Sequence, residues 1–429
     1  MLDAYFKLSD NQTTVRREIL AGVTTFLTMA YIAFVNPNIL ADTGMDRDAV
    51  FVATCVAAAL GSLIMGLWAN YPIALAPGMG LNAFFTYTVV LGMGHTWQVA
   101  LGAVFIAGVL FFILSVLKVR EWIINAIPHG LKLAIAAGIG LFLGIIGLKN
   151  AGIIVDHPVT LVTMGDLSLW PALLAVGGFL VMAALDSRRV PGAITIAILL
   201  TTAVGVITGV SPFGGVFSAP PSVAPTFLQM DIVGALDVSL ISVIFAFLFV
   251  DLFDTAGTLI GVAHRGGMLD EQGRLPRLGR ALMSDSSATV VGAVFGTSTT
   301  TSYIESVAGV KAGGRTGLTA VTVAVLFLLC LFFSPLAGTI PSYATAPALL
   351  LVACLMMRGL TEVDWEDVTE YAPAVVTAIG IPLTFSISDG IGFGFVTYAA
   401  IKILSGRFSE AGPAVTAIAV LFIIKFAVL

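Results

Sequence analysis

Charged residues are scarce in this chain. They make up only 10% of its 429 residues, whereas hydrophobic residues make up 58%. Because a soluble domain carries about 25% charged residues, this composition excludes an ordinary soluble protein and indicates a multi-pass membrane protein. The sequence has no basic run of the kind that binds nucleic acid, so we expect no nucleic-acid partner. Residues 1–18 mix acidic and basic side chains, which is not the pattern of a signal peptide.

Cysteine and histidine are also few, with three cysteines and four histidines in the whole sequence. The cysteines lie singly in apolar stretches, so their spacing predicts no disulfide framework. The histidines fall near the ends of apolar segments and do not have the spacing of metal ligands. We also find no nucleophile paired with a base. The sequence therefore predicts that the protein is not an enzyme and has no metal or cofactor.

Long runs of apolar residues make up most of the sequence. Segments of about 17–25 apolar residues span a bilayer, and broken segments are shorter. On this basis we predict an all-α membrane protein with about fourteen transmembrane segments, and a further apolar stretch at 412–428 exceeds this count. The predicted segments are 17–36, 49–68, 73–91, 97–117, 131–149, 169–186, 191–209, 239–263, 281–296, 303–313, 316–334, 343–358, 371–387 and 391–406.

Basic residues are distributed unevenly between the predicted loops. If the N-terminus is cytoplasmic, all but three of the 20 Lys and Arg residues, among them Lys118 and Arg120, fall in stretches on the cytoplasmic side. The other three are Arg47, Lys149 and Lys425, the last of which lies in the apolar tail. Because cytoplasmic loops carry an excess of Lys and Arg, we expect a multi-pass protein of the cell (inner or plasma) membrane with its N-terminus inside.

Two of the predicted segments cannot be regular helices. Residues 70–85 contain two prolines and two glycines in their first part, and residues 296–305 are rich in β-branched and hydroxyl side chains. If the chain divides near 219–221, each lies at the third segment of its half, and seven segments per half require an inverted second half. Single breaks are commonly proline kinks, but breaks at matching positions in two halves point to a transporter binding site.

Two acids lie within this apolar sequence, Asp254 in segment 239–263 and Glu305 after the second broken stretch. A carboxylate at membrane depth is costly unless it faces a cavity or a partner, and no Lys or Arg lies in the same layer. Such an acid can accept two parallel N–H bonds from a purine edge or carry a proton across the membrane. Asp251 and Thr258 share a helix face with Asp254, and Asp251 is equally consistent with a bond between helices.

Other polar and aromatic residues have two readings each. Asn82 offers a donor and an acceptor near the backbone of Gly80, either as a ligand contact or as a polar cap of the half-helix. Phe84 and Tyr303 have rings that stack on a planar ligand or pack in the core. We expect residues 36–37, an Asn-Pro pair, to end the first segment.

Four sequence blocks lie in order along the chain, at residues 24–32 with 36–37, residues 76–83, residues 249–258, and residues 300–306 with 313–317. Together they resemble the purine permease (AzgA-like) branch of the nucleobase:cation symporter family, which is related to the uracil and xanthine permeases. The resemblance covers nearly the whole chain. Residues 305–308, Glu-Ser-Val-Ala, depart from the Gln/Glu-Asn-x-Gly pattern of the uracil/xanthine branch, which favours adenine, guanine or hypoxanthine.

The resemblance implies a 7+7 inverted repeat with two broken half-helix segments, the third and the tenth. It implies a core domain of residues 1–130 (segments 1–4) and 235–335 (segments 8–11). A gate domain would contain residues 131–215 (segments 5–7) and 340–429 (segments 12–14 and the apolar tail). It also implies a substrate held between the broken segments, and a homodimer through the gate is consistent with it. The expected substrate-binding residues are Asp254, Glu305, Asn82, Tyr303, Gly80, Ile304 and Thr258, and the expected proton-coupling residues are Asp254, Glu305 and Asp251.

The sequence and the resemblance together predict a secondary active transporter that imports purine nucleobases, guanine and hypoxanthine or adenine, by proton symport. Its expected partners are the purine base and membrane lipid, and the expected coupling ion is H⁺. An alternative with the same fold is an anion transporter of the sulfate/bicarbonate type, although the acid at residue 305 opposes an anion site. A third alternative, an intramembrane enzyme or cofactor-bearing subunit, lacks any supporting residue spacing.

Overall fold

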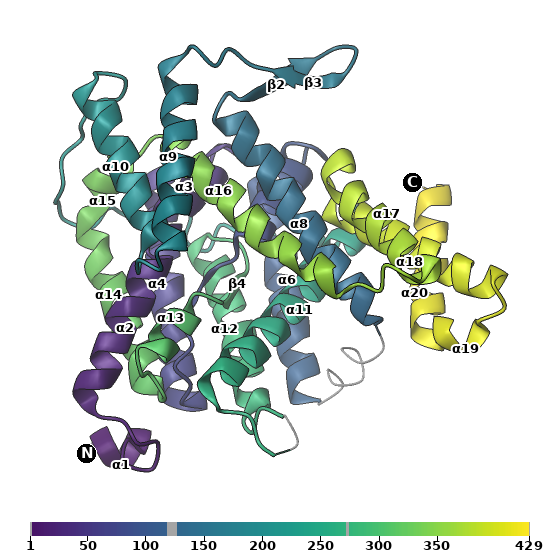
Figure 1. Ribbon diagram of the computed structural model, residues 1–429, viewed down its shortest axis with the longest axis horizontal. Coiled ribbons are helices and arrows are strands. Elements are labelled where there is room, and N and C mark those ends of the chain that lie inside the picture. The colour runs from purple at the N-terminus through teal and green to yellow at the C-terminus, as the bar shows by residue number, and fades with distance from the viewer. Residues whose placement is uncertain (1, 118–126, 272–273, 429) are drawn as a thin grey trace. The chain divides into compact units, whose positions relative to one another are not determined.

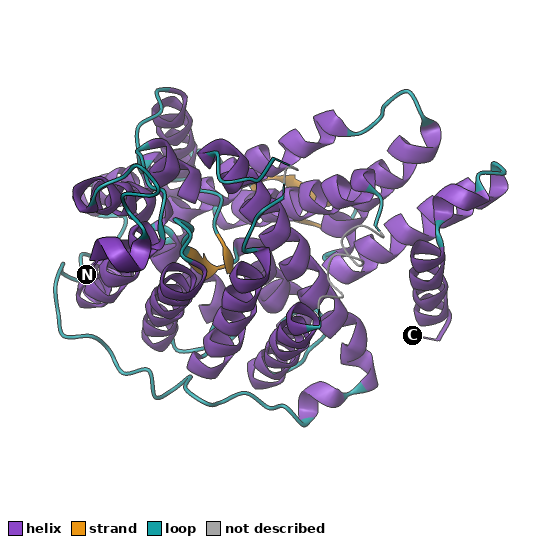
Figure 2. Ribbon diagram, turned by 90° about the horizontal axis from the view of Figure 1, so that it is seen from below, coloured by secondary structure: helices purple, strands orange, loops and turns teal. Residues whose placement is uncertain are grey.

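The computed structural model describes residues 2–117, 127–271 and 274–428, and within these ranges the chain is mostly helical (Figure 1, Figure 2). Nine helices of the described part are long and apolar enough to cross a membrane, and three shorter apolar helices accompany them. The predicted helical membrane class is therefore confirmed. The count of fourteen spans, the inverted repeat and the cytoplasmic N-terminus stay predictions. Lys118 and Arg120 lie outside the described residues.

The chain divides into two compact units. Unit 1 contains residues 1–116 and 150–348, and unit 2 contains residues 117–149 and 349–429. The predicted boundaries of core and gate remain a prediction, and we note that the two helices between residues 170 and 207 group with unit 1.

Unit 1 is built from helices around two short strands. Its helices are α1 (Leu2–Phe6), α2 (Val15–Met29), α3 (Ile32–Ala41), α4 (Arg47–Ile64), α5 (Met79–Ala83), α6 (Trp97–Val116), α9 (Trp170–Ser187), α10 (Ala193–Ile207), α11 (Ile241–Gly266), α12 (Leu278–Phe295), α13 (Ser306–Lys311), α14 (Gly317–Cys330) and α15 (Ser334–Thr339). Two π-helical turns extend α4 and α5, at Met65–Ala69 and Phe84–Val90, and 3-10 turns lie at Gly234–Leu236, Val238–Leu240 and Leu331–Phe333. The strands β1 (Leu75–Pro77) and β4 (Thr300–Ser302) pair in the interior, whereas β2 (Ile154–His157) and β3 (Leu161–Met164) form a hairpin.

Local sequence signals set several helix ends in unit 1. The side chains of Thr14 and Asp46 accept backbone N–H groups at the starts of α2 and α4, as expected of N-cap residues. Gly296 ends α12 with a φ of +97°, and a Cβ at this position would lie 2.3 Å from the Cβ of Thr226. Glycine is required there by both the left-handed backbone and the close approach.

Residues 36–37 do not end the first helical segment, so that prediction was wrong. Helix α3 continues through Pro37, and the chain instead breaks between α2 and α3, at Ala30 and Tyr31. A proline inside a membrane helix is tolerated when neighbouring groups satisfy the backbone. Asn36 is fully buried and donates to the hydroxyls of Thr54 (2.7 Å) and Thr297 (2.9 Å), so it ties α3 to its neighbours.

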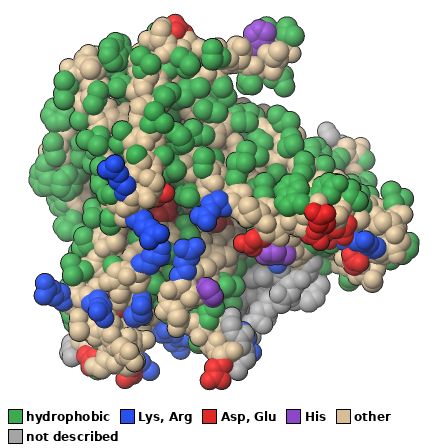
Figure 3. Space-filling view, viewed as in Figure 1, with side chains coloured by type: hydrophobic (Ala, Val, Ile, Leu, Met, Phe, Trp, Pro, Cys, Tyr) green, Lys and Arg blue, Asp and Glu red, His purple; other side chains and the backbone are tan. Residues whose placement is uncertain are grey.

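The surface of unit 1 is consistent with a lipid environment. Large apolar side chains such as Leu180 and Ile207 are exposed, at 62% and 84%, and exposed apolar faces of this extent are typical of membrane contact. On the face drawn in Figure 3, Lys and Arg side chains gather toward the end of unit 1 that carries α1, while hydrophobic side chains cover much of the remainder.

Unit 2 is helical, and its ion pairs lie near the ends of its helices. It contains α8 (His129–Asn150), the later part of α16 (Ser342–Met357), a 3-10 turn (Arg358–Glu362), α17 (Val368–Thr384), α18 (Ile387–Leu404), α19 (Phe408–Ala411) and α20 (Pro413–Val428). Helix α18 packs against both α17 and α20. Lys425 of α20 pairs with Asp389 of α18 at 2.6 Å, and both ends of this pair are partly exposed.

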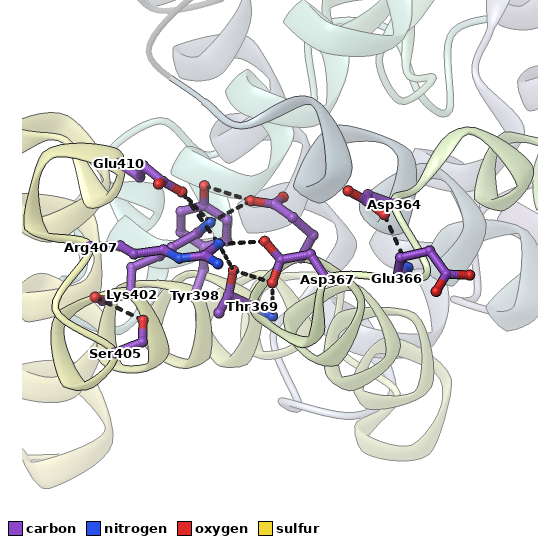
Figure 4. Close-up of polar contacts among 10 residues, drawn as sticks. Asp364, Glu366, Asp367, Thr369, Tyr398, Lys402, Ser405, Arg407 and Glu410 are labelled. Atoms are coloured by element: carbon purple, nitrogen blue, oxygen red, sulfur yellow. Dashed lines mark hydrogen bonds and ion pairs between the residues drawn. The ribbon is translucent and has the colours of Figure 1, made fainter.

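A polar cluster links α17, α18 and α19 (Figure 4). The Nζ atom of Lys402 lies 2.7 Å from Glu370 and 2.5 Å from Glu410, and its side chain is only 1% exposed. Nearby, the backbone N–H of Thr369, the guanidinium of Arg407 and the Thr369 hydroxyl donate to Asp367, and these bonds lower the pKa of its carboxyl to about 2. Because folding lowers this pKa, the ionised carboxylate stabilises the fold at pH values above the ordinary pKa of an aspartate. The stabilisation is lost as the pH falls towards 2.

We expect Lys402→Met to destabilise unit 2, because it leaves the Glu370 and Glu410 carboxylates without their shared cation. The loss should be about 2 kcal/mol, below that for a fully buried pair, since both carboxylates keep some solvent contact. Thermal unfolding of the purified protein in detergent measures it. Lys149→Met, the same change at an exposed site of unit 2, is the control. Equal unfolding temperatures for the two variants would contradict this role.

Candidate functional site

The two broken segments of the sequence meet as a two-stranded ribbon inside unit 1. Strands β1 and β4 are antiparallel, with Leu75 opposite Ser302 and Pro77 opposite Thr300. The N–H of Gly78 donates to the carbonyl of Thr299, and the N–H of Tyr303 donates to that of Ala74, both at 2.9 Å. Non-helical backbone at membrane depth persists only where its polar groups are satisfied within the protein. The ribbon meets this requirement because each broken segment supplies the partners of the other.

Each strand leads directly into a short helix. Helix α5 begins after Gly78, and α13 begins after Glu305, so both helices start at the ribbon. A Cβ on Gly78 would lie 2.8 Å from the Cγ2 atom of Thr301 on the opposite strand. The close approach of the strands therefore requires glycine at this position.

Side chains at the ends of the ribbon hold it in place. The hydroxyl of Tyr303 donates to the carbonyl of Pro77 at 2.6 Å, and the Tyr303 side chain is buried. The hydroxyl of Ser306 accepts the N–H of Ala74 at 3.0 Å, and that of Ser62 accepts the N–H of Leu75 at 2.9 Å. The structure thus gives Tyr303 an intramolecular bond, and a contact between its ring and a ligand stays a prediction.

Glu305 is held by a tyrosine from another part of the chain. The hydroxyl of Tyr31, at the break between α2 and α3, donates to Oε1 of Glu305 at 2.6 Å. Tyr31 is fully buried, whereas Glu305 is half-buried and Ile304 beside it is exposed. A short bond to a carboxylate is stronger than a neutral one, so Tyr31 fixes the position of the Glu305 carboxyl. Tyr31 belongs to the sequence block of residues 24–32, but the sequence alone assigned it no role.

Asp254 lies on α11 near Glu305. Asp254 is exposed, and it forms no hydrogen bond or ion pair with any described residue. Glu305 directly precedes α13, and α13 packs against α11. The structure therefore brings together the two acids that the sequence singled out, and it leaves the Asp254 carboxyl open to an external partner.

The remaining predicted contact residues surround the same ribbon. Asn82 of α5 is fully buried, its Oδ1 accepts the hydroxyl of Ser298, and its Nδ2 has no partner among the described residues. Gly80 is half-buried and Thr258 of α11 is buried. The rings of Phe84 and Phe247 pack edge to face, 5.2 Å apart, in the core.

The sequence analysis did not single out Asp285 of α12, a buried acid beside the ribbon. It is fully buried, and its Oδ1 accepts the hydroxyl of Ser302 at 2.8 Å. Asp251 of α11 faces the same helix, and its Oδ2 lies 2.9 Å from the hydroxyl oxygen of Thr289. The criterion that selected Asp254, an acid inside an apolar segment, applies equally to Asp285 in segment 281–296. Within the described ranges, no group of three or more His, Cys, Asp or Glu residues is arranged to hold a metal ion.

Comparison with known sequences gives a consistent result. The profile described as the Permease family matches residues 16–393. The putative permease MJ0326 from Methanocaldococcus jannaschii is 54% identical over 99% of this chain and 98% of its own. The adenine permease AdeP from Escherichia coli strain K12 is 50% identical over 99% of this chain and 96% of its own. The guanine/hypoxanthine permease PbuG from Bacillus subtilis strain 168 is 47% identical over 99% of each chain.

Comparison with solved structures identifies the fold. The transmembrane domain of a cyanobacterium bicarbonate transporter, BicA, superposes with a TM-score of 0.66 at 17% identity, over 87% of this chain and 96% of that one. The structure of SLC26A9 superposes with a TM-score of 0.64 at 10% identity, over 92% of this chain and 67% of that one. At these identities the likeness shows a shared transporter fold and carries no information on the substrate.

We expect Tyr303→Phe to destabilise the protein by about 1–2 kcal/mol, because the Pro77 carbonyl loses its buried donor. Tyr5→Phe is a matched control, since the Tyr5 hydroxyl donates to a carbonyl at 2.9 Å in an exposed position where water can replace it. Thermal unfolding in detergent compares the two. A Tyr303→Phe protein as stable as Tyr5→Phe would show that the hydroxyl does not hold the ribbon.

Proposed function

This chain belongs to the Permease family, in its purine permease branch, and from that premise we propose that it imports purine nucleobases, guanine and hypoxanthine or adenine, by proton symport. Its matches to adenine permeases and to guanine/hypoxanthine permeases are similar in identity and coverage. The family assignment makes the protein a multi-pass membrane transporter rather than an enzyme. The choice of base, the coupling ion and the residues that bind are part of the proposal.

The observation that carries this proposal is the pair of acids beside the ribbon. Asp254 has no partner within the described protein, and Glu305 is held in position by Tyr31. A carboxylate accepts two parallel N–H bonds, and a purine edge with adjacent N–H donors matches this geometry. Such a ligand would supply the donors that the Asp254 carboxyl lacks. The purine would then bind to the carboxylates without any Lys or Arg to balance their charge.

Transport requires that the site open to each side of the membrane in turn. The ribbon, α5 and α13 form one hydrogen-bonded body through the bonds of Gly78, Tyr303 and Ser306. We propose that this body moves as a unit within the core domain, and that the core moves against the gate to alternate access. Proton binding by Asp254 and Glu305, with Asp251, would couple this movement to the proton gradient, and the gate would carry the dimer contact.

An anion transporter of the same fold is the alternative. The fold likeness to a bicarbonate transporter is compatible with it, but no described Lys or Arg pairs with Asp254 or Glu305. Two acids at a binding site without a cation repel an anionic ligand. An anion carrier should keep its activity when both acids are replaced by amides, whereas a purine carrier should lose it.

We expect cells that lack their own purine permeases to take up labelled purine when they produce this protein. Glu305→Gln and Asp254→Asn should each raise the KM by at least about tenfold, because each removes charged hydrogen bonds worth about 1.5–3 kcal/mol. A protonophore should abolish accumulation by the unaltered protein. Adenine, guanine, hypoxanthine, uracil and sulfate are compared in the same assay. Sulfate uptake that survives both substitutions would support the anion alternative instead.

Tyr31→Phe should raise the KM for the purine about fivefold and leave the maximal rate nearly unchanged. The reason is that Glu305 stays in place but loses one positioning bond worth about 1 kcal/mol. Tyr87→Phe is a matched control, because the Tyr87 hydroxyl donates to the carboxylate of Asp42 at 2.7 Å in an exposed position. The pH profile of uptake should shift in Tyr31→Phe only. An unchanged KM and pH profile would exclude this positioning role.

A further inference from the structure

A second pair of acids lies between α11 and α12, apart from the pair beside the half-helices. Asp251 is 2% exposed and Asp285 is fully buried. Asp285 and Thr289 are four residues apart on α12 and share one face of it. Because the Thr289 hydroxyl contacts Asp251 at 2.9 Å, Asp251 lies against this same face of α12.

The contacts of Thr289 favour a proton on Asp251. Its hydroxyl oxygen lies 2.9 Å from Oδ2 of Asp251, 3.1 Å from the carbonyl of Thr300 and 3.2 Å from the N–H of Thr300. A hydroxyl has one hydrogen to donate. If Asp251 is ionised, this hydrogen can serve either the carboxylate or the carbonyl but not both. All three bonds form together when Asp251 is protonated and donates to Thr289, because the hydroxyl hydrogen then goes to the carbonyl.

Asp285 has a different environment, in which a hydroxyl donates to its carboxyl. The hydroxyl of Ser302 donates to its Oδ1 at 2.8 Å. Such a donor favours an ionised carboxylate. The second oxygens of both groups, Oδ1 of Asp251 and Oδ2 of Asp285, have no hydrogen-bond partner among the described residues. Buried polar atoms of this kind require an explanation.

No described Lys, Arg or His forms an ion pair with Asp251 or Asp285. The elements packed on α11 and α12 include α4, α5, α6, α13, β1 and β4. Of these, α5, α6 and the two strands contain no Lys, Arg or His, whereas α4 has Arg47 and Asp48 only at its start and α13 has Lys311 only at its end. The basic residues of α11 and α12 themselves lie near the helix ends, at His264, Arg265 and Arg280. Asp254, one turn along α11, adds a further negative charge. Two ionised carboxylates without a cation are costly in such surroundings, and one proton on the pair removes that cost.

We propose that Asp251 and Asp285 form a separate site that holds one transported proton, distinct from the acids Asp254 and Glu305 that face the purine. The site takes up a proton from the outer side, which changes its charge from two negative to one negative, and it releases that proton to the cytoplasm. This inference rests on the proposed function. It adds Asp285 to the proposed coupling residues. It also assigns the transported proton to Asp251 and Asp285 instead of to the substrate-binding acids.

The hydrogen bonds also connect the proton site to the ribbon. Ser302, which donates to Asp285, belongs to β4, and the Thr255 hydroxyl shares a 2.8 Å hydrogen bond with that of Thr301 on the same strand. Strand β4 continues through Tyr303 to Glu305. After loss of the proton, the ionised Asp251 would accept the Thr289 hydroxyl hydrogen, and the Thr300 carbonyl of β4 would lose it. The position of Glu305 thereby depends on whether the proton is bound.

The test uses the full-length protein in liposomes and two measurements of labelled purine. Accumulation driven by a pH gradient, acid outside, requires proton coupling, whereas counterflow exchange without a gradient requires only binding and alternation. Asp251→Asn retains a donor to Thr289 in place of the protonated acid, and Asp285→Asn removes the second titratable group. Both variants should exchange purine at nearly the native rate and fail to accumulate it. The control Asp237→Asn, at an exposed site of unit 1, should both exchange purine and accumulate it.

The other outcomes are equally informative. Variants that accumulate purine as the native protein does would overturn the proposal, as would folded variants that lose exchange together with accumulation. Accumulation by the native protein that follows a sodium gradient instead of a pH gradient would also overturn it. If the native protein moves no purine at all, the proposed function fails, and the proton site is then decided by spectroscopy.

Infrared spectroscopy of the native protein supplies that second readout and does not depend on transport or on the folding of an Asp251 variant. We expect a carboxylic acid C=O band at neutral pH that persists in Asp254→Asn and in Glu305→Gln. Where Asp251→Asn folds, the band should be lost. A native spectrum without such a band would overturn the proposal.

Discussion

The mutual hydrogen bonding of two interrupted segments is the constraint on which the rest of unit 1 depends. In a hydrocarbon layer each unsatisfied backbone group costs several kcal/mol, so neither β1 nor β4 is stable alone at membrane depth. Their pairing, extended by Gly78 and Tyr303, makes the interruption possible. The interruption in turn places Glu305 between a strand and a helix, within reach of Tyr31. The proposed binding site therefore needs no exposed edge of backbone in the middle of the membrane protein.

A second consequence concerns charge. The described interior near the ribbon holds Asp251, Asp254, Asp285 and Glu305 and no ion-paired cation for any of them. Buried charges in proteins are usually paired. In the proposed mechanism, protons and ligand donors take the place of a basic side chain, and each can leave. A site that is electrostatically complete only when its ligands are bound is suited to a carrier, because its occupancy alters the balance between conformations.

Much of this arrangement could be predicted from the sequence, for identifiable reasons. The composition excluded a soluble fold, and the prolines and glycines of residues 70–85 marked the first break directly. Several predicted segments begin and end close to the observed helices. For example, the predicted segment 97–117 corresponds to α6 at Trp97–Val116. The pairing of β1 with β4 could not be deduced, since strands of three residues separated by more than two hundred positions have no local signal. The end of the first helix was misplaced because tertiary contacts of Asn36 override the tendency of an Asn-Pro pair to stop a helix.

The most direct test of the central claim, that the two acids beside the ribbon recognise a purine, is an experimental structure of the protein with its transported base bound. The account predicts that an N–H edge of the base lies within hydrogen-bonding distance of both Asp254 and Glu305, and that Tyr31 still contacts Glu305. A base bound elsewhere, with both carboxylates facing only protein or water, would contradict it.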